Sequence, residues 1–315
     1  MNTQDMALLL HALSAPGVSF ILGAGASAPN LPTFAQLPSA ISANVDRLRR
    51  FPASPIQQSG LRALVQPIIQ QAQRTSELAE WKAGAMTTAT IAAILHRQLS
   101  RAHARPLPQY RVFALFPVTA SVVSFNWDGL AIAQCPQYTV LHPHGIVHPV
   151  QLGDAQFTNL LWQTQSTDEP LARHWYLPGL VLPGEEQCQA LRDIREEVLK
   201  LWMTANSLVV VGYSFGISSR GSYDSVWLDT FSEACIQNPA TAVHIISPDA
   251  EELRQAICDR IGRTVNVFAW SSRWDVLSRV LLRAANCISK PLSSLRCNRA
   301  EMELMVRSIA ELSER

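Results

Sequence analysis

Two glycines and a serine follow an apolar run near the start of the chain. The run covers residues 18–22, and Gly23, Gly25 and Ser27 come directly after it, separated by alanines. Because glycine has no Cβ, the backbone of such a turn can approach a ligand closely, and its free N–H groups can hold a phosphate. The segment predicts a phosphate-binding turn, although a tight strand-to-helix turn without a ligand has the same composition.

Residues that carry chemistry also follow four other apolar runs, which we predict to be strands. They are Asn126 and Asp128 after 120–125, His142 and His144 after 138–141, Gly212 and Ser214 after 207–211, and Ser247 after 242–246. Each type is common in turns. In an open parallel sheet, however, ligands bind outside the carboxyl ends of the strands. Together, these residues indicate a ligand site at one edge of a sheet.

The pair Asn126 and His144 suits the cleavage of a glycosidic bond. An asparagine side chain both donates and accepts hydrogen bonds, so Asn126 can hold a sugar hydroxyl or position a water molecule. A histidine titrates at about pH 6.5, which suits a general base at neutral pH. Asp128 can orient Asn126 or stabilise a growing positive charge. His142 is the alternative to His144 as the base.

Strands and helices alternate along most of the chain, which predicts an α/β fold. Apolar periodicity predicts helices at 4–15, 39–50, 60–75, 89–103, 186–204, 222–237, 249–261, 274–285 and 298–313. A last strand is expected at 264–268, and an extended piece at 179–182. This order is typical of a Rossmann-like, doubly wound, mostly parallel sheet. Asp224 and Trp227 lie on a predicted helix that either faces the ligand or is merely amphipathic, and we favour the second.

We divide the chain into two parts. Residues 1–273 form the predicted nucleotide-binding catalytic domain, with a helical insert at about 39–108. Residues 274–315 form a helical C-terminal extension.

The composition excludes several classes of function. The chain has 315 residues with 26 Lys and Arg against 25 Asp and Glu, so its charge favours neither nucleic acid nor an anionic membrane as a partner. No two of its six cysteines are spaced C-x-x-C, so we expect no zinc ribbon and no metal. The cysteines are scattered, and the sequence has neither a signal-peptide pattern nor a run of roughly 18 apolar residues. We therefore expect a cytoplasmic protein.

These motifs, in this order, resemble those of the sirtuin superfamily. The matching segments are Gly23–Ser27, Asn126–Asp128, His144–Gly145 and Gly212–Ser214. The resemblance implies that the first segment holds the pyrophosphate of NAD and that the second contacts the nicotinamide ribose. It also implies that His144 is the catalytic histidine, because a glycine follows it, whereas His142 lacks that glycine.

The resemblance extends to further cofactor contacts. The turn with Gly212 and Ser214 is expected to contact a phosphate and the adenosine ribose. Ala24 belongs to the pyrophosphate loop, and we add Ser247 at the next strand end. Pro32 and Phe34 are what remain of a Pro-Asp-Phe-Arg element that follows the glycines in sirtuins, and the arginine of that element is missing here.

The sequence departs from the sirtuin pattern where protein deacylases bind zinc. Between the catalytic histidine and the Gly-x-Ser turn, deacylases carry two C-x-x-C pairs, whereas this chain has only Cys188. The cleft that holds an acyl-lysine peptide is therefore in doubt. Sirtuin-like chains without zinc and with a Gly-Tyr-Ser turn resemble bacterial antiphage enzymes that hydrolyse NAD.

We therefore predict an NAD glycohydrolase that acts in antiphage defence by depleting NAD, releasing either ADP-ribose or a cyclic product. Because unregulated NAD loss would kill the host, we expect a regulatory or sensor partner, or assembly into a homo- or hetero-oligomer, to switch it on. The helices at 39–108 and 274–313 are the candidate contact surfaces. The alternatives are a sensor that binds NAD or ADP-ribose without turnover and, less favoured, a protein deacylase or ADP-ribosyltransferase.

Overall fold

A computed structural model describes the protein over the residues that position the predicted site. The described residues are 3–14, 16–31, 107–116, 121–135, 137–145, 174–176, 189–218, 221–222, 224–262 and 265–288. The expected helices at 39–50, 60–75, 89–103 and 298–313, the extended piece at 179–182 and Phe34 lie outside these residues.

The core of the fold is a seven-stranded sheet in which every neighbouring pair is parallel. Its strands, in spatial order, are β4 (His174–Tyr176), β3 (Thr139–His142), β2 (Ser121–Ser124), β1 (Val18–Leu22), β5 (Ser207–Val211), β8 (Ala242–Ser247) and β9 (Asn266–Ser271). A separate two-stranded antiparallel hairpin joins β6 (Ile217–Ser218) to β7 (Gly221–Ser222). The sheet confirms the predicted α/β, doubly wound, Rossmann-like fold.

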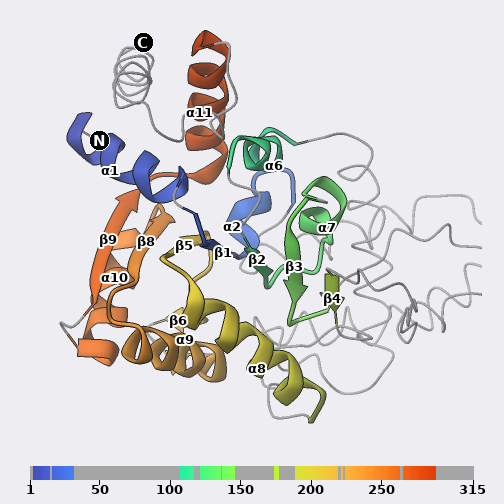
Figure 1. Cartoon of the computed structure of the whole chain (residues 1–315), viewed down its shortest axis with the longest axis vertical. Helices are drawn as coiled ribbons and strands as arrows, with labels where there is room; N and C mark the ends of the chain where they lie inside the picture. Colours follow the sequence, from blue (N-terminus) through green and yellow to red (C-terminus); the bar gives the residue numbers. More distant parts are fainter. Residues whose placement is uncertain are drawn as a thin grey trace, which may run out of the picture.

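Helices cover both faces of the sheet (Figure 1). On one face lie α1 (Thr3–Ser14), α2 (Ala24–Ser27), α6 (Pro108–Arg111), η3 (Val112–Leu115), α7 (Leu130–Gln134) and α11 (Trp274–Ile288). On the other lie α8 (Gln189–Thr204), α9 (Ser225–Gln237) and α10 (Ala250–Ile261). The chain thus builds two hydrophobic cores with the sheet between them.

The central strand β1 shows why the sheet needs both layers. All five of its residues are buried. Phe20 and Leu22 pack into the core beneath α1, α6 and α11, whereas Ile21 packs into the core beneath α8 and α9. Successive side chains of a strand point to opposite faces, so a continuous apolar run requires cover on both.

The strands follow the sequence-based prediction more closely than the short helices do. Strand β1 has the predicted limits, and β2 ends one residue before the predicted limit at residue 125. Helix α2, formed within the glycine turn, and the pair α6 and η3 were not predicted. These three short helices pack into the core on one face of the sheet, where tertiary packing rather than local periodicity maintains them.

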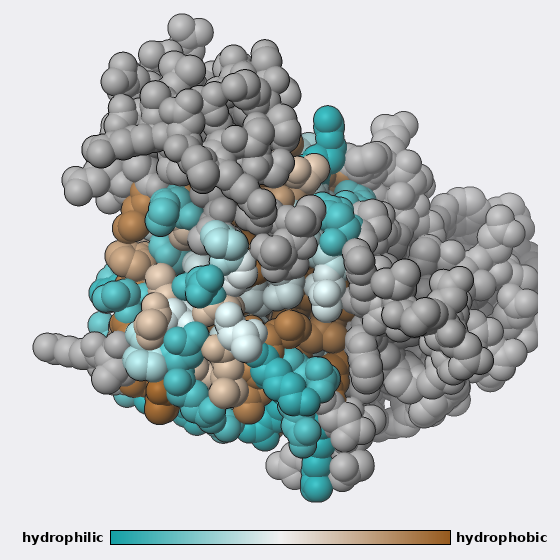
Figure 2. Space-filling view, viewed as in Figure 1, coloured by the Kyte–Doolittle hydropathy of each residue, from teal (hydrophilic) through white to brown (hydrophobic). Residues whose placement is uncertain are grey.

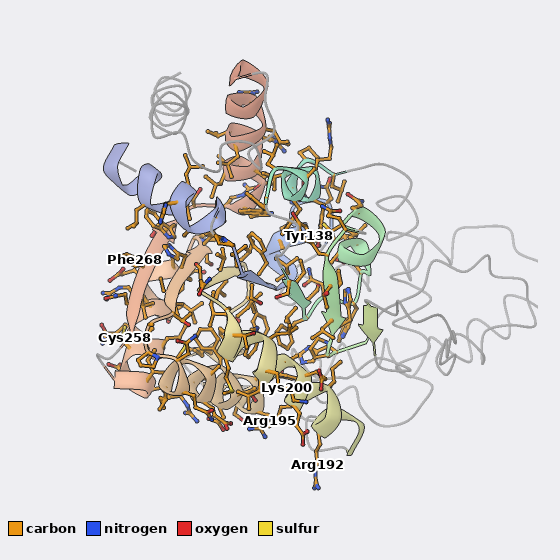
Figure 3. The ribbon with its side chains drawn as sticks, in the orientation of Figure 1. Tyr138, Arg192, Arg195, Lys200, Cys258 and Phe268 are labelled. Carbon is orange, nitrogen blue, oxygen red and sulfur yellow. The ribbon has the colours of Figure 1, made fainter. Side chains whose placement is uncertain are left out.

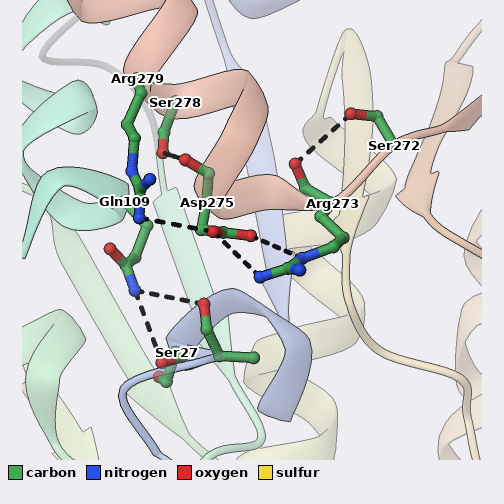
Figure 4. A network of polar contacts seen from close by, with 8 residues as sticks. Ser27, Gln109, Ser272, Arg273, Asp275, Ser278 and Arg279 are labelled. Carbon is green, nitrogen blue, oxygen red and sulfur yellow. Dashed lines mark hydrogen bonds and ion pairs between the residues drawn. The ribbon is translucent and has the colours of Figure 1, made fainter.

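Helix α11 is anchored to the back of the glycine turn. The Trp274 indole donates a hydrogen bond to the Gln109 carbonyl at 2.8 Å, and the Gln109 side chain donates to the Ala28 carbonyl at 3.3 Å. The buried Asp275 carboxylate accepts two hydrogen bonds from Arg273 and lies 3.5 Å from Arg279 (Figure 4). These contacts fix α6 and α11 behind α2. The boundary predicted at 273/274 stays a prediction.

The outer surface of the described layers is mixed. Hydrophilic residues gather over α8 in the space-filling view (Figure 2), where Arg192 and Lys200 extend from the helix (Figure 3). Arg195 instead reaches α9 and donates to Thr230 at 2.7 Å. Within the described part of the chain, no helix combines the length and apolar character that crossing a membrane requires.

Candidate functional site

The predicted site residues lie where the order of the strands reverses. From β1 the chain adds β2, β3 and β4 on one side, and then returns to add β5, β8 and β9 on the other. In open α/β sheets a crevice forms outside the carboxyl ends of the strands at such a switch point, and ligands bind there. Here the turns after β1 and β5 flank that point.

The glycines of these two turns allow the two backbones to touch. A Cβ on Gly25 would lie 2.8 Å from the Gly212 Cα, and one on Gly212 would lie 2.5 Å from the Gly25 Cα. The Gly23 amide donates to the Val211 carbonyl at 3.0 Å, and the Gly25 amide donates to the Gly212 carbonyl at 3.1 Å. Two amides expected to face a phosphate therefore join the turns. Ala24 and Gly25 are half-buried, and Gly23 is buried.

Ser27, at the end of α2, is the centre of a buried set of hydrogen bonds that we call the Ser27 network. It comprises Ser27, Tyr110, Asn126 and Asp128, from three distant parts of the chain. The Ser27 hydroxyl donates to Asp128 Oδ2, while Asn126 Nδ2 donates to Ser27 Oγ at 3.2 Å. Tyr110 Oη lies 2.8 Å from Ser27 Oγ. The other carboxylate oxygen of Asp128 accepts the Leu130 amide at 2.9 Å.

Counting hydrogens fixes the direction of the Tyr110 bond. A serine hydroxyl has one hydrogen and two lone pairs. Because that hydrogen goes to Asp128 and one lone pair accepts from Asn126, the remaining lone pair accepts from Tyr110. Tyr110 must therefore be a neutral phenol. Complete burial, helped by the negative charge of Asp128, raises the pKa of Tyr110 well above its usual value.

A second buried set, which we call the His144 network, comprises His144, Asp224 and Tyr213. The Tyr213 hydroxyl donates to Asp224 Oδ2 at 2.9 Å. The other carboxylate oxygen, Oδ1, lies 3.5 Å from His144 Nε2. That separation is within ion-pair range and longer than a normal hydrogen bond. His144 is 9% exposed and Asp224 is 8% exposed.

Aromatic rings hold the His144 network in place. The His144 ring packs edge-on against Phe125, with ring centroids 5.0 Å apart. Phe125 is stacked flat on Tyr213 at 4.2 Å, and Trp227 of α9 meets both Phe125 and His144 edge-on. Since Phe125 precedes Asn126 in the chain, the same turn after β2 connects the two networks.

The turn after β5 carries backbone strain. Phe215 is fully buried and adopts a φ of +52°, a region that bulky residues rarely occupy. Its ring packs on Tyr213 and on Phe231 of α9. The strained turn places Tyr213 under Asp224, at the first residue before α9, and leaves Ser214 exposed at the surface.

The remaining predicted residues lie around these two networks. The His142 ring is completely buried, and its Nδ1 lies 3.1 Å from the Asn126 carbonyl oxygen. Ser247 is half-buried at the end of β8, and its hydroxyl accepts the Asp249 amide at 3.3 Å.

Sequence reasoning missed Tyr110 and did not favour Asp224 as a site residue. Tyr110 gives no sequence signal, because its contact with Ser27 spans 83 positions. Asp224 was weighed as part of an amphipathic helix, yet its buried carboxylate faces His144. Its place one residue before the helix that follows the Gly-Tyr-Ser turn is the signal that was available.

No group of three or more His, Cys, Asp or Glu side chains that could hold a metal ion occurs among the residues that the structure describes. Cys188, the cysteine in the region where deacylases carry their zinc ribbon, lies outside them.

Known proteins resemble this chain in structure and not in sequence. No family model matches the chain, and no curated protein matches it in sequence. A mutant Sir2 homologue in complex with ADP-ribose is similar in structure, with 15% identity, a TM-score of 0.49, and coverage of 92% of this chain and 99% of that one. A Sir2 homologue–NAD complex has 15% identity and a TM-score of 0.47, covering 90% and 94%. The likeness is one of overall fold.

Proposed function

We propose that the protein cleaves the bond between nicotinamide and ribose in NAD. What supports this proposal is that Asn126 and His144 follow the neighbouring strands β2 and β3, each within its own buried polar network. A protein that only bound a dinucleotide would need neither a fixed amide nor a histidine facing a carboxylate. We propose NAD as the substrate because the sequence motifs and their order resemble those of sirtuins.

The two turns at the switch point provide the proposed binding site for the rest of the dinucleotide. Gly23, Ala24 and Gly25 form the narrow turn that the pyrophosphate approaches. Ser214, which is exposed after β5, and Ser247 after β8 are the proposed contacts on the adenosine side. Phe34 remains a proposed contact from the sequence alone.

The geometry gives Ser27 a different proposed role from the one expected from sequence. Ser27 is 1% exposed, and its hydroxyl already makes three hydrogen bonds inside the protein. We therefore assign Ser27 to the positioning of Asn126 rather than to direct contact with a phosphate. Because Nδ2 of Asn126 points to Ser27, its Oδ1 is the atom left to accept a hydrogen bond from a ribose hydroxyl or a water.

His144 is the proposed general base. It takes a proton from a water whose oxygen bonds to C1′ of the nicotinamide ribose. The C1′–N bond breaks, its electron pair returns to the ring nitrogen, and neutral nicotinamide leaves. ADP-ribose and one proton are the other products. Attack by a group of the same dinucleotide instead of water would give a cyclic product. His142 is the weaker candidate because its ring is turned to the Asn126 backbone.

We further propose that the activity is gated by a protein partner or by assembly of several copies, because unregulated NAD loss would kill the cell. Loss of NAD on activation would then serve antiphage defence. This part of the proposal rests on the resemblance of the sequence to antiphage enzymes.

The test is the release of nicotinamide and ADP-ribose from NAD by the purified full chain, together with the NAD content of expressing cells challenged with phage. We expect Asn126→Ala and His144→Ala to lower NAD cleavage by about 10²–10⁴-fold, the usual effect of removing a general acid or base. His11→Ala, which changes an exposed histidine on α1, is the matched control and retains activity. Unchanged NAD cleavage in both folded site variants would contradict the proposal.

A further inference from the structure

We propose that Asp224 is a positioning residue that holds a proton on Nε2 of His144, so that Nδ1 is the nitrogen that accepts the proton during the reaction. The inference rests on the proposed function for the identity of that reaction. The orientation and tautomer of His144 do not depend on it.

The first argument is the need of a buried carboxylate for partners. Asp224 is 8% exposed, and a buried charge is costly unless it is paired and hydrogen-bonded. Oδ2 accepts from Tyr213. Oδ1 is buried and has no hydrogen-bond partner among the described residues, and Nε2 of His144 lies 3.5 Å from it. A hydrogen on Nε2 is what this oxygen lacks.

The second argument is the contrast with Asp249, which occupies the same position before α10 that Asp224 occupies before α9. Neither side chain caps its helix. The Asp249 residue is exposed, so water can solvate its carboxylate. Asp224 is instead buried, in contact with Tyr213 and facing His144. The position before a helix therefore does not by itself require the Asp224 arrangement.

The third argument is that the ring has little freedom to turn away. Phe125 and Trp227 pack edge-on against His144, and Phe125 is itself stacked on Tyr213, the donor to Asp224. Catalytic hydrogen bonds are often long in the free enzyme and shorten when substrate binds. The 3.5 Å separation fits a contact that closes when His144 becomes positively charged.

Among the described residues, the other titratable groups near His144 have partners of their own. His142 of β3 is directed to the Asn126 carbonyl. Asp128, after β2, accepts from Ser27 and from the Leu130 amide. Tyr213 donates to Asp224. Of these groups, Asp224 is thus the acid that faces the His144 ring.

The decisive readout is the ¹⁵N spectrum of the histidine rings in the full-length protein, because it distinguishes the two tautomers and follows the protonation of the ring. The His144 resonance is assigned as the one missing from His144→Gln. We expect the tautomer protonated on Nε2 in the wild type. In Asp224→Asn, the pH midpoint of His144 falls, because a negative charge that favours the imidazolium is removed.

Two further variants separate charge from structure. Asp229→Asn removes a carboxylate of α9 that pairs with Arg260 at the surface, and it leaves the His144 spectrum unchanged. Tyr213→Phe removes the hydrogen bond to Asp224 and keeps the negative charge, so the His144 midpoint does not fall. If Asp224→Asn fails to fold, two measurements still test the role of Asp224: the tautomer of His144 in the wild type, and the direction in which Tyr213→Phe moves the pH midpoint of His144.

Kinetics provide the second readout. Asp224→Asn lowers kcat for NAD cleavage by about 10-fold or more while KM for NAD changes little, a smaller loss than the 10²–10⁴-fold expected, as an order of magnitude, for removing the base itself. A wild-type His144 protonated on Nδ1, or a spectrum unaffected by Asp224→Asn, overturns the inference. Spectral changes as predicted in a protein that never cleaves NAD would uphold the role of Asp224 and refute the proposed function.

Discussion

The Ser27 network and the His144 network differ in how completely their hydrogen bonds are made. Ser27 uses its hydrogen and both lone pairs within the protein. Asp224 has one hydrogen bond at 2.9 Å and faces His144 at 3.5 Å. Fully satisfied buried networks are rigid and specify one arrangement. The difference fits the proposed roles, because Asn126 has to be fixed before NAD arrives, whereas His144 has to change its charge during the reaction.

The largest expected effect comes from a substitution where the turn after β1 touches the turn after β5. We expect Gly212→Ala to lower the free energy of unfolding by about 4 kcal/mol, from backbone strain and overlap combined. The φ of Gly212 is +57°, and an added Cβ would lie 2.5 Å from the Gly25 Cα. Because one turn carries Ser27 and the other carries Tyr213, both networks should loosen together. Denaturant unfolding measures the loss.

Gly262→Ala is the control for this change. Gly262 has a φ of +74° with no atom within 4 Å of an added Cβ, so it carries strain without a collision. Its loss of stability should be clearly smaller. Equal losses in the two variants would mean that close contact of the turns is unimportant.

A buried histidine outside both networks, His244, is expected to make the stability of the fold depend on pH. Burial lowers the pKa of His244 from 6.5 to about 4, and its Nδ1 accepts a hydrogen bond from the Trp270 indole. The unfolded chain therefore binds a proton that the folded chain does not, and stability is lost as pH falls from about 6.5 to about 4. The full loss is about 3 kcal/mol.

The variant His244→Gln should flatten this dependence in unfolding experiments at several pH values. In that background, the acid dependence that remains can be attributed to groups such as those of the two networks. A pH dependence as steep as that of the wild type would show that His244 is not its source.

The smallest expected difference is in the free energy of unfolding between two variants, Tyr213→Phe and Tyr110→Phe, each of which removes one buried hydroxyl. Tyr213→Phe should lower the free energy of unfolding by about 2 kcal/mol, because a buried carboxylate loses its hydrogen bond. Tyr110→Phe should cost about 1 kcal/mol, because Ser27 keeps two other partners. Tyr138→Phe, which removes a buried hydroxyl bonded to the Phe113 and Phe116 carbonyls, is the control that leaves NAD cleavage unchanged. A larger loss in Tyr110→Phe than in Tyr213→Phe would reverse the comparison.

The sequence predicts the sheet well because its signal is local. The apolar run at 18–22 and the run at 207–211 are strands with those limits, and their position before glycine turns already places two turns at one edge. Parallel strands buried on both faces are continuous apolar runs, and such runs are visible without knowledge of their neighbours.

The arrangement within the site could not be predicted in the same way. Ser27 meets Asp128 across 101 positions and Tyr110 across 83, and no periodicity encodes contacts of that range. The glycines show the same limit. Their composition indicated room for a phosphate, and their amides at Gly23 and Gly25 in fact bind the backbone of the neighbouring turn.

The most direct test of the central claim is a crystal structure of the wild-type protein with a non-hydrolysable NAD analogue. We predict that the pyrophosphate lies over the turn of Gly23–Gly25 and that the nicotinamide ribose lies within hydrogen-bond distance, about 3 Å, of Asn126 Oδ1, with the His144 ring beside its C1′. A dinucleotide bound with its adenosine end at Asn126 and His144, or bound away from the switch point, would contradict the proposal that this site cleaves NAD.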